Sequence, residues 1–95
     1  MIKFYVYLII AKRLSRYITY VGYTNDIKKR INLHNTSKGA KFTKGTKWVL
    51  IFQKKFPTKT IAMKEEYRLK KNYKLRKYLK NLYLMKNENR NFTTL

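Results

Sequence analysis

A chain of 95 residues without cysteine is long enough for one small domain and has no disulfide, thiolate zinc site or iron–sulfur cluster to staple it. Hydrophobic residues make up 44% and aromatic residues 16%, which favours a compact core over a disordered tail. The balance of 24 basic against 4 acidic residues gives a net charge of +20 and points to nucleic acid as the partner. The apolar stretch 5–11 is too short to span a membrane and lacks a cleavage site, so we expect an intracellular, cytoplasmic protein.

Two strands are expected first. Residues 2–10 alternate in character, with an apolar row on one face and Tyr7 on the other. Residues 12–16 form a basic connection to a second β-branched and aromatic strand over residues 17–23. The short link predicts an antiparallel hairpin, in which Gly22 is a structural residue that permits a close approach of the backbone or a bulge.

A helix follows the hairpin. Thr24 or Asn25 is the expected N-cap, and Asp26 is well placed for the positive end of the helix dipole. Arg30 and His34 are four residues apart, so both lie on one stripe of this helix.

The next segment is a glycine- and lysine-rich loop over residues 37–46, which we expect to be mobile. A third strand over residues 48–52 ends before Pro57. The loop lysines are either solvated cations or phosphate contacts. They are Lys38, Lys41 and Lys44.

A second helix begins at Thr58 or Thr60 and places Ala62, Glu66 and Lys70 on one stripe. Glu66 at this spacing is either a functional carboxylate or an ordinary ion-pair partner of Lys70.

A polar break near Asn72 precedes a third helix with apolar residues at helical spacing. We expect residues 1–86 to form a single domain and residues 87–95 a polar, frayed C-terminal tail. The predicted fold class is α+β: a three-stranded antiparallel sheet flanked by helices, in the order β-β-α-β-α-α.

Several segments together resemble the motifs of the GIY-YIG nuclease superfamily. Tyr5-Val6-Tyr7 stands where that family has its first motif, with Tyr5 in place of the glycine, and Tyr20-Val21-Gly22 matches the second. Residues 22–30 resemble the passage into the family's arginine, and residues 34–45 resemble small stand-alone members related to the excision-repair nuclease domain. Residues 62–70 resemble the helix that carries its metal-binding glutamate.

The resemblance implies a catalytic set. Its members are Tyr7, Tyr20, Arg30, His34 and Glu66. Tyr7 is implied as the general base, and because tyrosine titrates near pH 10, roughly, surrounding positive charge is expected to favour its phenolate. Tyr20 would orient the water or the phosphate, and His34 would hydrogen-bond the tyrosine pair or donate to a phosphate.

The side-chain chemistry of two of these residues fits the roles that the resemblance implies. Arg30 presents a planar fork of donors that fits a scissile phosphate. Glu66, together with waters and a phosphate oxygen, suits one Mg²⁺ or Mn²⁺ ion. Glu65 is the competing carboxylate, displaced about 100° around the helix. Without the resemblance, the tyrosines read as ordinary strand aromatics and Arg30 as a solvated cation.

The expected function is a divalent-metal-dependent endonuclease that hydrolyses DNA with little sequence specificity, or that selects DNA by its shape. The alternatives are a catalytically inactive binder of DNA or RNA on the same fold, and a small basic structural protein of the ribosomal kind. No membrane partner is expected, and the protein is expected to be a monomer or a weak homodimer. The predicted DNA contacts are Lys28, Lys29, Lys38, Lys41, Lys44 and Lys70.

Overall fold

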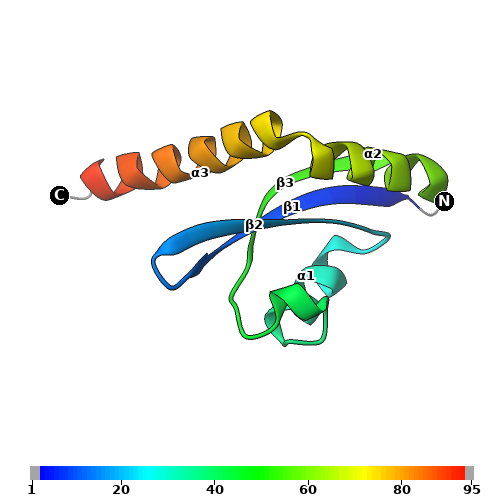
Figure 1. Cartoon of the computed structure of the whole chain (residues 1–95), viewed down its shortest axis with the longest axis horizontal. Coiled ribbons are helices and arrows are strands. Elements are labelled where there is room, and N and C mark those ends of the chain that lie inside the picture. The colour runs from blue at the N-terminus through cyan, green and yellow to red at the C-terminus, as the bar shows by residue number, and fades with distance from the viewer. Residues whose placement is uncertain (1–2, 94–95) are drawn as a thin grey trace.

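The computed structural model describes residues 3–93 and has a three-stranded antiparallel sheet in the order β2-β1-β3 (Figure 1). The strands are β1 (Phe4–Arg13), β2 (Arg16–Thr24) and β3 (Val49–Phe56), and the helices are α1 (Ile27–Asn35), α2 (Lys59–Lys71) and α3 (Tyr73–Thr93). A short 3₁₀ turn, η1 (Lys41–Thr43), interrupts the loop before β3. The predicted fold class and element order are confirmed.

The β1–β2 hairpin is longer than predicted. Pairing runs from Tyr5–Thr24 to Arg13–Arg16 and leaves only Leu14 and Ser15 in the turn, so the predicted basic connection is mostly strand.

Strand β3 contains an irregularity that affects its packing. Leu8 pairs with Phe52 but Ile9 pairs with Leu50, so Ile51 is the extra residue of a β-bulge. The strand starts at Val49 and extends past its predicted end, because both Ile51 and Phe52 find places against the core and the pairing continues.

Each helix is capped by the residue whose side chain reaches a free backbone N–H of the first turn. Asp26, not Thr24 or Asn25, caps α1: its backbone is extended and its carboxylate accepts a hydrogen bond from the Lys29 N–H at 3.1 Å. Thr24 holds the cap itself, accepting from the Asp26 N–H. Thr58 caps α2, one of the two predicted possibilities.

Helix α3 begins after Asn72, where α2 ends, and remains helical to Thr93. Residues 87–93, predicted as a frayed tail, are therefore helical, and the last two residues of that tail lie outside the described residues. Within residues 3–93, no helix is both long enough and apolar enough to cross a membrane.

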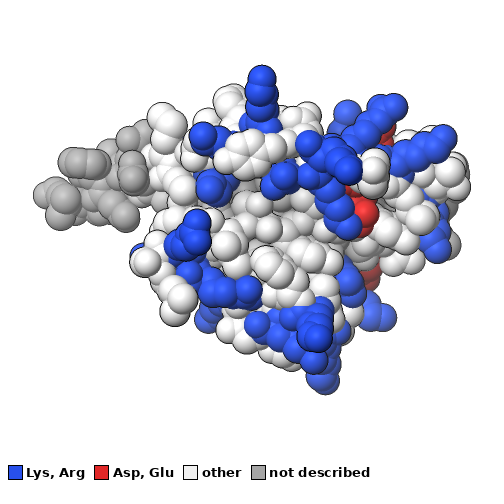
Figure 2. Space-filling view, viewed as in Figure 1, with Lys and Arg blue, Asp and Glu red and all other residues white. Residues whose placement is uncertain are grey.

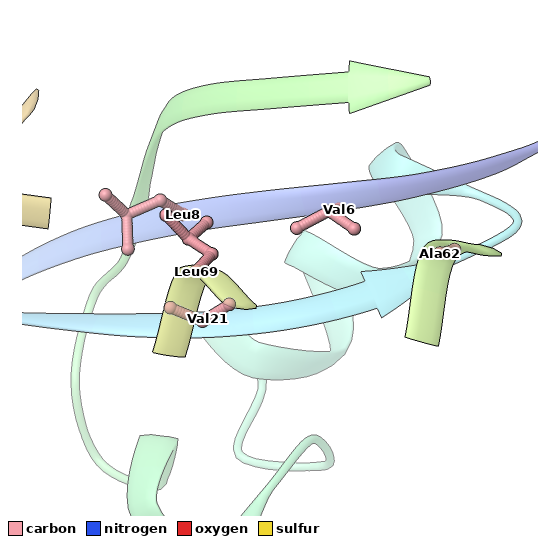
Figure 3. Close-up of a cluster of buried hydrophobic side chains, with 5 residues drawn as sticks. All are labelled: Val6, Leu8, Val21, Ala62 and Leu69. Carbon is pink, nitrogen blue, oxygen red and sulfur yellow. The ribbon is translucent and has the colours of Figure 1, made fainter. Parts of the chain in front are cut away.

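The two faces of the sheet have different cores. On one face, buried residues of β1 and β2 pack against α2, as Figure 3 shows for Val6, Leu8 and Val21 with Ala62 and Leu69. On the other face, Tyr7 and Ile9 lie with Trp48 and the partly buried isoleucines of α1. The alternation of β1 therefore places Tyr7 away from the α2 core, as predicted.

Candidate active site

Tyr7 lies in the middle of the central strand and is fully buried. It pairs with Gly22 on β2, and its ring lies across that glycine, since a Cβ at Gly22 would overlap the Tyr7 hydroxyl. The missing side chain at Gly22 is what allows the tyrosine to lie flat toward the β2 edge.

Helix α1 supplies two partners for the Tyr7 hydroxyl. His34 Nε2 lies 2.8 Å from Tyr7 Oη, and Arg30 Nε donates to the same oxygen at 3.3 Å. His34 is fully buried and Arg30 is half-buried. The structure thus brings Tyr7, Arg30 and His34 into direct contact.

The direction of hydrogen bonding can be worked out from the far end of this network. The Thr43 hydroxyl donates to the Ala40 carbonyl at 2.8 Å, and a carbonyl can only accept. Thr43 Oγ1 must then accept from His34 Nδ1–H, 2.8 Å away. The proton on Nδ1 leaves Nε2 as an acceptor, so Tyr7 donates its hydroxyl proton to His34.

The loop that carries Thr43 is tied down at several points, so the prediction of a mobile loop is wrong for the residues nearest the site. Arg13 donates to the Phe42 carbonyl at 2.7 Å and to Thr46 Oγ1 at 2.7 and 3.1 Å. Gly39 lies directly against His34, where a Cβ would come within 2.5 Å of Nδ1.

Trp48 joins the loop to α1. Asn35 accepts from the Trp48 N–H at 2.6 Å and donates to its carbonyl at 3.1 Å, while the indole N–H donates to the Thr43 carbonyl at 3.0 Å. The loop therefore encloses His34 instead of hanging free beside it.

Tyr20 borders the same site from β2. Its ring meets His34 edge-on at 5.3 Å between centroids and stacks against Phe42 at 6.0 Å. It lies between the buried histidine and the exposed aromatic ring of the loop.

Burial raises the pKa of Tyr7, and the hydrogen bond and charge of Arg30 offset only part of that effect. Tyr20 and Glu66 raise the pKa of Tyr7 further. The expectation that positive charge would favour the phenolate is therefore wrong for the free protein, because desolvation outweighs Arg30.

The same environment acts on the histidine. Burial, with the Arg30 charge adding to it, lowers the pKa of His34 to about 4. The site therefore holds a neutral tyrosine that donates to a neutral histidine.

The two candidate carboxylates on α2 point to different surroundings. Glu66 pairs with Lys70 at 3.3 Å, its side chain is 18% exposed, and its charge acts on Tyr7. Glu65 pairs with Arg68 and lines a cavity of about 250 Å³ between α2, α3 and the sheet, on the Val6 side. No cluster of three or more His, Asp or Glu side chains that could hold a metal occurs within the described residues.

A shallow groove of about 290 Å³ follows the outer edge of β2. Its lining residues are Thr19, Tyr20, Val21, Phe42, Lys70 and Arg76. In Figure 2, basic side chains stand above and below a pale strip across the middle of this face. The six lysines predicted to contact DNA are all exposed.

Several residues of the site were not predicted. Thr43, Arg13 and Asn35 support His34 or its loop only through contacts between segments far apart in the chain. Their types and spacings are ordinary, and no local pattern distinguishes Thr43 from the other hydroxyl residues nearby.

Residues 3–81 match the family model of the "GIY-YIG catalytic domain". The chain is 48% identical over 71 residues to the UPF0213 protein YazA of Bacillus subtilis, covering 74% of this chain and 69% of that protein. It is 43% identical over 67 residues to the UPF0213 protein OB0043 of Oceanobacillus iheyensis, covering 70% and 74%. A solution NMR structure of the UPF0213 protein BH0048 from Bacillus halodurans is 35% identical, with a TM-score of 0.45 and 84% of each chain covered. The chain belongs to the GIY-YIG family of nuclease domains, among its small UPF0213 proteins.

Proposed function

We propose that this protein is a divalent-metal-dependent endonuclease that hydrolyses phosphodiester bonds of DNA with little preference for sequence. Family membership indicates a nuclease that acts on nucleic acid. The observation that carries the proposal is the buried Tyr7 hydroxyl, held between Arg30 and His34. Tyr20, which contacts His34, also lines a groove that Lys70 and Arg76 border.

The hydrogen-bond direction supports a proton relay. As the attacking water gives its proton to the Tyr7 oxygen, the Tyr7 proton passes to His34 Nε2, so no free phenolate is required. The negative charge of a bound phosphate would raise the basicity of His34 from its low resting value. Thr43 holds the ring in the tautomer that can accept this proton.

Arg30 is placed to act on the phosphate. Its Nε is used by Tyr7, which leaves the other guanidinium N–H groups for phosphoryl oxygens. The same side chain would thereby align the tyrosine with the phosphorus it serves.

Glu66 is the residue that would hold the metal ion. One carboxylate plus waters and a substrate phosphate oxygen is a donor set that Mg²⁺ or Mn²⁺ accepts. A bound ion supplies charge stabilisation at the phosphoryl and leaving oxygens. Lys70, which pairs with Glu66 in the free protein, would turn to a phosphate when the ion binds.

A catalytically inactive binder on the same fold is the main alternative. Such a binder needs the surface lysines but has no use for a desolvated tyrosine, arginine and histidine in contact, since buried polar groups are costly unless they are fully paired. That cost favours the nuclease.

Plasmid nicking tests the proposal. The wild type should nick supercoiled DNA with Mg²⁺ or Mn²⁺ and stop when the metal is chelated, while Arg30→Ala should lower the rate by about 100-fold or more and still bind DNA. Arg68→Ala is the matched control: it removes one arginine charge from α2, where Arg68 pairs with Glu65, and it should nick at the wild-type rate. Binding without nicking by the wild type would favour the inactive binder.

A further inference from the structure

The turn of the β1–β2 hairpin has an unfavourable backbone conformation and an unfavourable pair of charges. Leu14 has a φ of 58°, a backbone conformation that a bulky residue rarely adopts. Of the two turn residues, only Leu14 has a positive φ, which is the sign pattern of a type II′ turn with glycine normally in that place. Arg13 and Arg16 face each other across the last pair, although like charges directly opposite are destabilising.

The same turn exposes an apolar side chain among cations. Leu14 is 94% exposed, the highest value among the large hydrophobic residues of 3–87, whose side chains the structure describes. Lys12 and Arg16 are exposed beside it, and Lys12 covers the ring of Tyr17 at 5.6 Å. Figure 1 shows the turn at the left end of the sheet, away from α2.

The turn is mechanically linked to the candidate site. Arg13 extends from β1 to the Phe42 carbonyl and to Thr46, so it braces the hairpin against the loop that carries Thr43. Leu14 lies one residue past the end of β1 and seven residues from Tyr7. That spacing corresponds to about 23 Å, or about seven base pairs of duplex, at typical strand and DNA rises.

We propose that Leu14 is a wedge that enters a base step of duplex DNA while Lys12 and Arg16 hold the flanking phosphates. Apolar side chains on basic surfaces partly unstack and kink DNA in this way, and flexible or mismatched steps are the easiest to open. The inference rests on the proposed function and adds to it a preference for deformable duplex at a set distance from the cut.

A membrane surface is the competing partner for a basic, apolar tip. One leucine side chain is much smaller than a myristoyl chain, which by itself binds membranes only marginally. The hydrogen bonds from Arg13 to the loop that carries Thr43 link the turn to the candidate active site, and membrane attachment would not need such a link.

The test compares wild type, Leu14→Gly and Leu14→Phe on a duplex of about four helical turns with one central mismatch. Glycine removes the wedge and suits the positive φ, so Leu14→Gly should unfold at the same temperature as wild type or higher. Phenylalanine keeps an apolar wedge. The readouts are affinity over a range of salt concentrations and the positions of cuts with Mg²⁺.

We expect Leu14→Gly to bind the mismatched duplex about 10-fold more weakly, with an unchanged salt slope because no charge is removed. Wild type and Leu14→Phe should cut preferentially about seven base pairs from the mismatch, and Leu14→Gly should lose that bias. Equal affinity and cut positions in wild type and Leu14→Gly would overturn the wedge while leaving the nuclease intact. A wild type that neither binds nor cuts DNA would overturn both proposals. Binding of each variant to vesicles of equal phosphatidylserine and phosphatidylcholine is measured in parallel. A Leu14→Gly defect in vesicle binding alone would overturn the DNA wedge and favour a membrane partner.

Discussion

The two faces of the same sheet perform different tasks. Against α2 and α3, Val6 and Leu8 of β1 pack in a cluster of apolar side chains. Against α1, the odd-numbered Tyr7 meets His34 and Arg30 through hydrogen bonds. We call the face that packs on α2 the stabilising face, and the face that carries Tyr7 the chemical face. Because strand side chains alternate, a shift of one residue in β1 would exchange one face for the other.

The difference lies in how each face holds its residues. Apolar packing tolerates small displacements and contributes stability in proportion to buried area. Buried polar groups must be paired, so the chain from Tyr7 through His34 to Thr43 allows few arrangements. The site is thus held in place by the requirement for hydrogen bonds, and the scaffold by burial.

Removing the Tyr7 hydroxyl should break the chemical face most severely. Tyr7→Phe loses the relay atom, so nicking should fall by about 1000-fold. It also leaves His34 Nε2 without a donor, at a cost of about 1–3 kcal/mol in unfolding free energy. Tyr5→Phe removes the same atom two residues away and should leave the nicking rate unaltered, and an equal loss in both variants would remove Tyr7 from the mechanism.

Truncating a side chain on the stabilising face should lower stability and leave catalysis unchanged. Leu8 is fully buried, so Leu8→Ala should lower the free energy of unfolding by about 2–5 kcal/mol in urea titrations. Leu8→Val should lower the free energy of unfolding by less. Nicking per folded molecule should match wild type in both, whereas a selective loss of catalysis would mean that the faces are coupled.

Acid should weaken the chemical face. The pKa of His34 is about 4 in the folded protein against 6.5 for the free side chain, so the unfolded state binds the proton first as pH falls. The contribution of the neutral His34 ring to the free energy of unfolding is therefore full above about pH 6.5 and is lost toward pH 4, by about 3 kcal/mol.

His34 is the only histidine, so its NMR titration is unambiguous. A midpoint near the ordinary value would contradict the buried, neutral ring. His34→Gln should lack this share of the pH dependence, which separates it from the titration of carboxylates.

The smallest effect is expected at Thr43. Thr43→Val cannot accept from His34 Nδ1–H, which should lower kcat about 10-fold with little change in KM. Thr43→Ser keeps the hydroxyl and should restore the rate. Nitrogen chemical shifts of the ring should show the Nδ1–H tautomer in wild type and Thr43→Ser, and the same tautomer in Thr43→Val would contradict the positioning role.

Local patterns predicted the fold well. Three features depend only on residues close together in the chain, so the sequence was enough to predict them. They are the alternation in β1, the helical stripe of Arg30 and His34, and the Thr58 cap. The α1 cap was placed wrongly because three polar residues in a row compete for it, and only geometry shows that Asp26 reaches the Lys29 N–H.

The support of the site was not predictable in the same way. Thr43 and Trp48 act on α1 across a loop, and Arg13 acts from the far end of the hairpin. The sign of the Tyr7 pKa shift also depends on burial set by the whole fold, which outweighs the charge that sequence can count.

The most direct test of the central claim exchanges one carboxylate at a time on α2. Glu66→Gln and Glu65→Gln remove the same charge from adjacent residues, but only Glu66 acts on Tyr7, while Glu65 lines the cavity on the opposite face. In Mg²⁺, Glu66→Gln should nick plasmid at least about 100-fold more slowly than wild type, and Glu65→Gln should nick at the wild-type rate. Equal nicking by the two variants, or undiminished nicking by Glu66→Gln, would contradict a metal-dependent site built around Tyr7, Arg30, His34 and Glu66.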